Sequence, residues 1–233
     1  MTFRVISLLT GGKDSVYSLY YAISQGWEVL ETLTICPKVD ETLMYHYPNA
    51  RLAELSSKAM GVRNYRLELD KQGEDKELEV LFSYLSDRRD VDGIVTGAIK
   101  SEYQRTRFDR VCEELGIRSI SPLWRKDEMA LLREMIEFGM EIIIVGISAE
   151  GLGKEWLGRK LDLNSLRNLE RLSEEFGFNP SGEGGEFETL VVDAPFYRMK
   201  IDIIDYEVIW NGYSGIYLIR RAKLTRKNYQ GVS

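Results

Sequence analysis

Short apolar runs alternate with segments of helical periodicity along the first half of the chain. Residues 3–9 form an apolar run rich in β-branched side chains, which is typical of a buried strand. Apolar side chains from Val16 to Ile23 then repeat at the spacing of one helix face, and Gly26 follows as a helix stop. The same alternation predicts strands at residues 28–36, 65–69, 93–99 and 117–120, and helices at residues 49–60, 77–85 and 104–115.

This alternation predicts an α/β fold with a five-stranded parallel sheet and helices on both faces, because crossover helices cover a parallel sheet. After Pro122 the pattern changes. It predicts a helix at 128–138, a strand at 141–148, a loop at 152–163, a helix capped by Asn164, and strands at 201–210 and 215–224 around an Asn-Gly hairpin turn. We therefore expect an α/β domain over residues 1–125 and a smaller α+β domain over residues 126–233 that ends in a β-hairpin.

Composition places the chain among globular proteins. Hydrophobic residues make up 44% and charged residues 29%. The most apolar run, 142–147, is too short to span a bilayer, and no secretory signal follows the first residues, so we expect a cytoplasmic protein without a membrane partner. The net charge of −6 does not indicate a nucleic-acid binder. Two cysteines without a CxxC spacing and a single histidine exclude a disulfide framework and a His-based metal centre.

A glycine-rich turn, TGGKDS at residues 10–15, joins the first predicted strand to its helix. Ligands bind at this end of an open α/β sheet, and free N–H groups with the helix dipole favour phosphate there. Lys13 adds a positive charge, and Asp14 has the oxygen ligands that magnesium prefers. The loop lacks the spacing of a Walker A motif. As an alternative, Asp14 and Ser15 only cap the helix. We expect the turn to be exposed.

TGGKDS resembles the SGGxDS loop of the PP-loop ATP pyrophosphatases, which have an adenine nucleotide alpha hydrolase-like fold. The resemblance implies that ATP is cleaved to AMP and pyrophosphate, with the loop holding pyrophosphate and Mg²⁺. It places ATP at Thr10, Gly11, Gly12, Lys13, Asp14, Ser15 and Gly97, with Asp14 as the metal ligand and with Lys13 and Asp14 as catalytic residues.

Three further segments, GAIKSEYQR (97–105), SPLW (121–124) and GEGGEFET (182–189), resemble the diphthine–ammonia ligase family when taken with TGGKDS. This resemblance implies that ATP adenylylates the carboxylate of diphthine, a modified histidine on translation elongation factor two. Ammonia then displaces AMP and leaves diphthamide. The cofactors would be ATP and Mg²⁺, and the partners would be the elongation factor and ammonium.

The resemblance also suggests roles for residues in these segments. Ser101, Tyr103, Gln104 and Glu183 would bind substrate, although Ser101 and Gln104 also fit a helix capping box. If residues 186–190 are extended, Glu186 and Glu188 point to one side, where they could take a proton from ammonium as catalytic residues. As an alternative, these glutamates belong to a solvated acidic loop. His46 stands in MYHYPN, where a structural role competes with a place in the nucleotide pocket.

Two other functions remain open. The first is a PP-loop enzyme that modifies tRNA by thiolation or lysidine formation. It draws on the basic side chains near the end of the chain, which are Arg220, Arg221, Lys223, Arg226 and Lys227. The second is a nucleotide-sensing module without chemistry. Release of pyrophosphate separates enzyme from sensor, and the acceptor separates the two enzymes.

Overall fold

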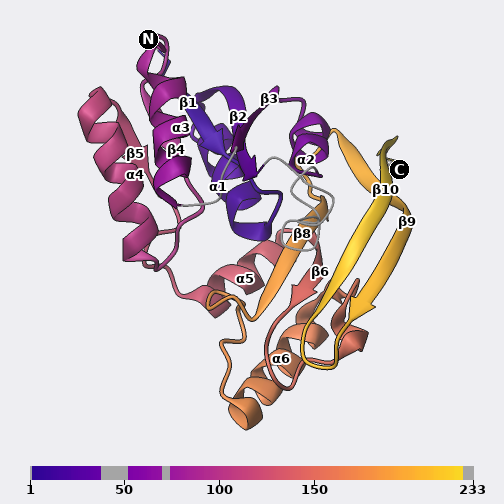
Figure 1. Cartoon of the computed structure of the whole chain (residues 1–233). Coiled ribbons are helices and arrows are strands. Elements are labelled where there is room, and N and C mark those ends of the chain that lie inside the picture. The colour runs from indigo at the N-terminus through magenta and orange to yellow at the C-terminus, as the bar shows by residue number, and fades with distance from the viewer. Residues whose placement is uncertain (1, 38–51, 70–73, 228–233) are drawn as a thin grey trace.

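The first sheet is parallel and has five strands in the order β3-β2-β1-β4-β5 (Figure 1). The computed structural model describes residues 2–37, 52–69 and 74–227. The strands are β1 (Arg4–Leu8), β2 (Glu28–Pro37), β3 (Asn64–Leu69), β4 (Gly93–Val95) and β5 (Arg118–Ile120). The predicted five-stranded parallel sheet is therefore confirmed.

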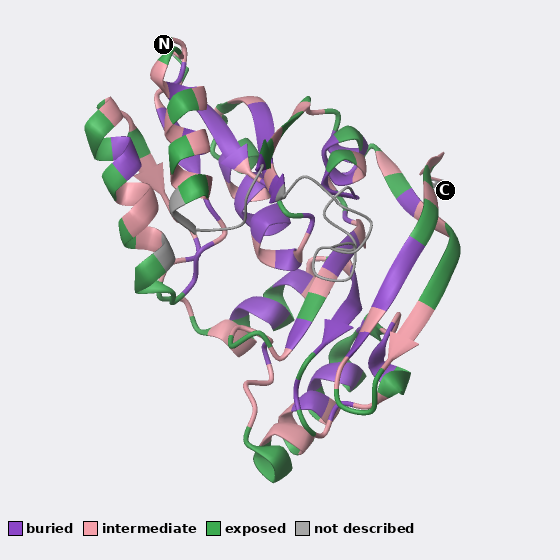
Figure 2. Ribbon diagram, viewed as in Figure 1, coloured by how far each residue is buried: buried purple, intermediate pink, exposed green. Residues whose placement is uncertain are grey.

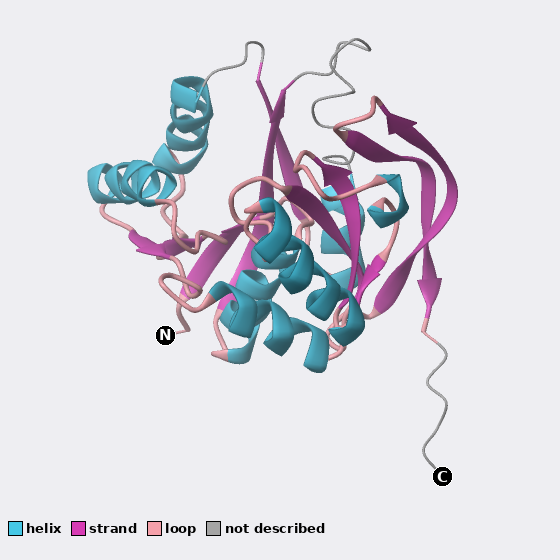
Figure 3. Cartoon of the chain, turned by 90° about the horizontal axis from the view of Figure 1, so that it is seen from below, coloured by secondary structure: helices cyan, strands magenta, loops and turns pink. Residues whose placement is uncertain are grey.

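Helices cover both faces of this sheet, as predicted (Figure 3). They are α1 (Lys13–Ser24), α2 (Ala53–Met60), α3 (Glu74–Ser86) and α4 (Glu102–Leu115). Successive strand residues face opposite ways. Ile6 accordingly packs in a cluster with Leu81 of α3 and Cys112 of α4, whereas Val5 packs with Ala22 of α1. Cys112 is thus a core residue.

The second half builds an antiparallel sheet. Its strands are β6 (Glu141–Ile147), β7 (Lys160–Leu161), β8 (Phe187–Asp193), β9 (Met199–Trp210) and β10 (Gly215–Arg226), and its helices are α5 (Glu128–Glu137) and α6 (Leu163–Phe176). β8 runs along β6, which also pairs with β7 and β10, and β9 and β10 form the predicted hairpin. Figure 2 shows that β6 is largely buried, whereas β9 has several exposed residues along its length.

Four local predictions need correction. The segment expected as a loop at 152–163 contains a short 3-10 helix, Lys154–Trp156, and strand β7. Asp162, not Asn164, caps α6, because its carboxylate accepts a hydrogen bond from the Ser165 amide at 2.6 Å. β4 ends at Val95, short of the predicted Ile99. β8 extends to Asp193, where no strand was expected beyond residue 190.

Buried side chains from both halves meet in the largest hydrophobic cluster. Leu9 and Val16 come from the first half, and Ile142 and Leu190 come from the second. β8 reaches the loop after β1, where the Val191 amide donates to the Gly11 carbonyl at 3.0 Å. The second half therefore lies directly against the TGGKDS loop of the first half. Within the described ranges, no helix is long and apolar enough to cross a bilayer.

Candidate active site

The TGGKDS loop forms a tight turn between β1 and α1 at the carboxyl end of the sheet. Gly11 has φ +86°, a left-handed conformation that favours glycine. The Ser15 hydroxyl donates to the Gly12 carbonyl at 3.0 Å and accepts from the Thr10 amide at 3.2 Å. These contacts hold the loop in shape, and the hydroxyl oxygens of Thr10 and Ser15 lie 3.1 Å apart.

Lys13 is buried, contrary to the exposure expected of the turn, because the GEGGEFET segment covers it. Its ammonium donates to Asp14 Oδ2 at 2.8 Å and to Glu183 Oε1 at 2.5 Å. Burial by itself would lower the pKa of Lys13, but the two carboxylates outweigh burial and raise that pKa above its ordinary value. Burial raises the pKa of the Glu183 carboxyl, and Lys13 partly offsets this effect. Lys13 is therefore a charged ammonium held between two acids.

The second half also contacts the start of helix α1. Gly12 at the N-cap provides no side-chain cap, and the Lys13 amide instead donates to Thr189 Oγ1 at 3.2 Å. Gly97, which follows β4, lies against the same turn. A Cβ at Gly97 would stand 2.8 Å from the Ser15 nitrogen, so glycine is required for this close approach. Gly97 thus supports the backbone of the predicted ATP site.

Asp14 has the features of a magnesium ligand. Its Oδ2 pairs with Lys13, while its Oδ1 is buried and has no hydrogen-bond partner. Buried polar oxygens are rarely left unpaired, so this atom fits an additional ligand. Within the described residues, no group of three or more His, Cys, Asp or Glu side chains is arranged to hold a metal. One or two carboxylates suffice for Mg²⁺ when phosphates and water complete its shell.

The three glutamates of GEGGEFET have different surroundings. Glu183 reaches Lys13. Glu186 precedes β8 and accepts from the amides of Asn179 at 3.0 Å and Gly184 at 2.8 Å, so its carboxylate braces its own loop. Glu188 lies on β8 beside Gly146, and its side chain is exposed. Partial desolvation by the surrounding protein nevertheless raises the pKa of the Glu188 carboxyl.

The predicted substrate residues of GAIKSEYQR lie at the start of α4. Ser101 directly precedes this helix. Tyr103 is 56% exposed, and its hydroxyl accepts from Arg107 at 2.7 Å. Gln104 lies in α4, but its side chain falls outside the described part of the structure, as does all of His46. The hydroxyl of Tyr103 thus has a partner on its own helix.

Sequence reasoning missed two residues at this site. Thr189 contacts the Lys13 amide, and it could have been found because it ends the GEGGEFET segment. Glu128 contacts Lys100 at 3.1 Å and Asn179 at 2.9 Å, so it joins the GAIKSEYQR segment to the residues just before GEGGEFET. Glu128 stands at the start of a predicted helix, and no motif in the sequence indicates this role.

Comparison with known proteins identifies relatives along both halves. A family model described as the diphthamide synthase N-terminal domain matches residues 3–119, and one described as the diphthamide synthase C-terminal domain matches residues 127–225.

Proteins named diphthine–ammonia ligase are similar over most of the chain. The zebrafish protein (Danio rerio) is 35% identical over 222 residues, covering 87% of this chain and 86% of the relative. The human protein is 31% identical, with 88% and 85% covered. The Schizosaccharomyces pombe protein is 34% identical over 88% of this chain, which spans only 37% of that relative's length.

A solved structure described as a predicted subunit of a tRNA methyltransferase from Methanocaldococcus jannaschii is also similar. It has a TM-score of 0.48 and 19% identity, with 83% of this chain and 98% of that chain covered. The family assignment rests instead on the two family models, which together match nearly all of the chain, and on the relatives above 30% identity. The chain therefore belongs to the diphthamide synthase family.

Proposed function

We propose that this chain is an ATP-dependent ligase that amidates diphthine on translation elongation factor two with ammonia. One observation carries the proposal. Lys13 of the nucleotide-type loop is bound by Glu183 and by Thr189 of GEGGEFET, so two motifs far apart in the sequence form one site. A site of this kind can hold ATP and an acceptor together, as an acyl-transfer reaction requires.

In the first step, a carboxylate oxygen of diphthine attacks the α-phosphorus of ATP and pyrophosphate leaves. Lys13 and the loop amides offset the negative charge on the departing pyrophosphate. Asp14 would hold Mg²⁺ through Oδ1, and the ion would neutralise phosphate charge when bound. Asp14 and Glu183 bring two carboxylates to one ammonium, so we expect ATP to bind as its magnesium complex.

In the second step, ammonia attacks the acyl carbon and AMP leaves with the electron pair of the broken C–O bond. Ammonium must lose a proton before this attack. Glu188 suits this task better than Glu186, because the carboxylate of Glu186 is engaged by two loop amides, while that of Glu188 is exposed and has a raised pKa. Glu183 would then orient the acceptor beside Lys13.

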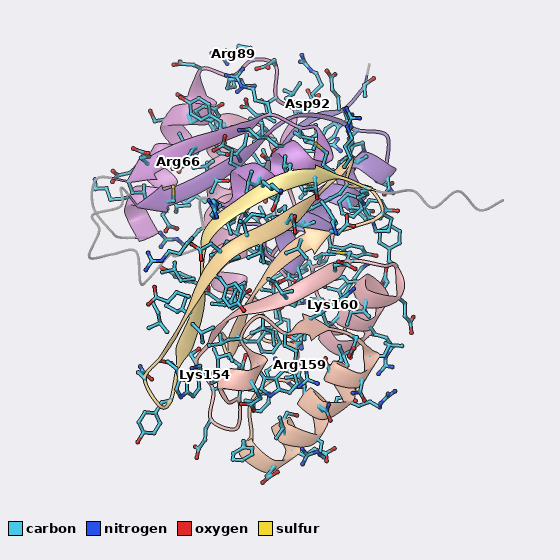
Figure 4. All side chains as sticks on the ribbon, turned by 90° about the vertical axis from the view of Figure 1, so that its right-hand side faces the viewer. Arg66, Arg89, Asp92, Lys154, Arg159 and Lys160 are labelled. Carbon is cyan, nitrogen blue, oxygen red and sulfur yellow. The ribbon has the colours of Figure 1, made fainter. Side chains whose placement is uncertain are left out.

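The tRNA-modifying alternative depended on the basic residues near the end of the chain, and some of these residues lie opposite acids on β9. Arg220 pairs with Glu207 at 2.6 Å, and Asp202 lies opposite Lys223 in the hairpin register. The basic side chains labelled in Figure 4 beyond the hairpin are matched in part as well, since Lys160 pairs with Glu141 at 2.5 Å. This balance favours a protein acceptor.

The direct test combines nucleotide analysis with mass spectrometry of the acceptor. Purified protein is incubated with ATP, Mg²⁺, ammonium and diphthine-bearing elongation factor. We expect AMP and pyrophosphate in equal amounts, together with an acceptor about one mass unit lighter, because amidation replaces OH by NH₂. Formation of ADP and orthophosphate would exclude the PP-loop reaction. AMP formation with modified tRNA and an unchanged elongation factor would favour the alternative enzyme.

A further inference from the structure

Glu128 links two segments that lie far apart in the sequence. It is the first residue of α5, and only 11% of its side chain is exposed. Its Oε1 lies 3.1 Å from the Lys100 ammonium in the segment after β4. Its Oε2 accepts a hydrogen bond from Asn179 Nδ2 at 2.9 Å. A carboxylate this far from solvent is stable only if such partners compensate its lost hydration.

The Asn179 side chain, which Glu128 holds, also binds Ser181. Its Oδ1 accepts from the Ser181 amide at 3.0 Å and from the Ser181 hydroxyl at 2.7 Å. The Ser181 side chain is fully buried, and its hydroxyl also lies 3.4 Å from the second oxygen of Glu128. The three residues form a closed polar network immediately before Gly182 and Glu183.

The same network is tied to the other end of the loop. The backbone amide of Asn179 donates to one carboxylate oxygen of Glu186, and the second oxygen accepts from the backbone amide of Gly184. Glu183, the residue that reaches Lys13, therefore lies in the sequence between Asn179 and Glu186, which are hydrogen-bonded to each other. Asn179 in turn is held by Glu128.

We propose that Glu128 is a positioning residue that fixes the GEGGEFET loop so that Glu183 meets Lys13. This inference rests on the proposed function only for its kinetic consequence. The hydrogen bonds of Glu128 reach the loop through Asn179 and Ser181. Truncating Glu128 leaves a donor of Asn179 without its acceptor beside a buried serine, and the loop loses one of the contacts that hold its present shape.

The experiment compares Glu128→Ala, Glu128→Gln and Glu137→Ala. Glutamine keeps an oxygen that can accept from Asn179, and Glu137 is an exposed acid on the same helix. We expect Glu128→Ala to lower kcat about tenfold with a change in KM for ATP below about threefold, because the loop serves the acceptor. Glu128→Gln should recover most of the loss, and Glu137→Ala should match the wild type.

Hydrogen exchange provides a readout that does not depend on the reaction. The Gly184 amide should exchange about tenfold faster in Glu128→Ala, while Glu128→Gln and Glu137→Ala stay close to the wild type. Asn179→Ala removes the same hydrogen bond from the other side and should reproduce the fast exchange. If the wild-type chain makes no AMP, the proposed function fails, but this exchange comparison still decides the role of Glu128.

Two results would overturn the inference. Unchanged exchange and unchanged kinetics in Glu128→Ala would mean that the network does not hold the loop. Equal kinetic losses in the alanine and glutamine variants, with unchanged exchange in both, would mean that the charge of Glu128 acts on the substrate directly.

Discussion

At the scale of single residues, Lys13 has both a functional and a structural task. It is 5% exposed and pairs with two carboxylates, so removing it leaves the half-buried Asp14 and Glu183 as like charges without their counter-charge. We predict that Lys13→Ala lowers turnover more than about tenfold, or roughly 1.4 kcal/mol of transition-state stabilisation. The variant should also lose about 3 kcal/mol of unfolding free energy, as is typical when one partner of a buried ion pair is removed.

AMP formation and urea unfolding would measure these two losses. Asp14→Asn serves as the comparison, because it also lowers turnover more than about tenfold by weakening the proposed metal ligand, but leaves Lys13 paired with Glu183. Near-normal turnover in both folded variants would mean that TGGKDS is only a structural turn.

The two glutamates flanking Phe187 should respond differently to loss of charge. We predict that Glu188→Gln slows amide formation, leaves ATP affinity within about threefold of the wild type, and recovers part of its activity at higher pH, where free ammonia needs no base. Glu186→Gln should slow the reaction without such recovery, since its carboxylate braces the loop. Calorimetry of ATP binding and amide formation against pH would test both. Collapse of ATP affinity in Glu188→Gln would place that residue in the nucleotide site.

The raised pKa of Glu188 also has a consequence for stability. A carboxyl with a higher pKa in the folded state binds more protons there than in the unfolded chain, so stability falls as pH rises from the unfolded pKa through the folded one. Ionised Glu188 is therefore unfavourable at neutral pH. We predict that Glu188→Gln raises Tm at pH 7 and leaves it nearly unchanged below about pH 4, where both proteins carry a neutral group. An equal shift at both pH values in thermal unfolding would contradict this cause.

At the scale of elements, helix α1 depends on a cap from another part of the fold. Its N-cap is Gly12, and Thr189 on β8 accepts the hydrogen bond of the Lys13 amide. We predict that Thr189→Val costs about 1 kcal/mol of unfolding free energy, the usual worth of such a cap, whereas Thr189→Ser is nearly neutral. Urea denaturation would measure both. Equal stability of the valine and serine variants would show that the hydroxyl contributes nothing.

The sequence predicted the elements whose signals are local. Strands and helices of the first sheet alternate with clear periodicities and glycine stops, so their order followed directly. β7 and the end of β8 beyond residue 190 were missed because strand formation there depends on pairing with β6, which lies far away in the chain. The cap of α6 was misplaced because Asp162 and Asn164 both suit an N-cap, and only the Ser165 amide distinguishes them.

The site could be predicted in its parts but not in its connections. TGGKDS and GEGGEFET were both recognised from their residues. That Glu183, rather than Glu186 or Glu188, reaches Lys13 depends on a contact 170 positions apart in the sequence. The burial of Lys13 has the same origin, because the residues that cover it come from the second half.

At the scale of the whole molecule, the two halves share one hydrophobic cluster. The division at residues 125 and 126 remains a prediction from the sequence pattern. Leu9 and Leu19 of the first half belong to the same cluster as Val145 and Leu190 of the second. Separating the halves would expose these side chains to water, at a cost proportional to the apolar area. Because of this cost, the TGGKDS loop and strand β8, which covers it, are expected to fold together.

We therefore predict that the chain unfolds in one cooperative transition. Leu190 is 1% exposed and lies against Gly11, so Leu190→Ala should lower the unfolding free energy by roughly 2–5 kcal/mol. Trp27 reports on the first half and Trp210 on the second, so single-tryptophan variants, in which Trp124 and Trp156 are also replaced by phenylalanine, distinguish the halves in urea. Both reporters should give the same midpoint, and Leu190→Ala should shift both equally. Two separate midpoints, with only the Trp210 signal shifted, would show that the halves unfold independently and that the shared cluster does not join them.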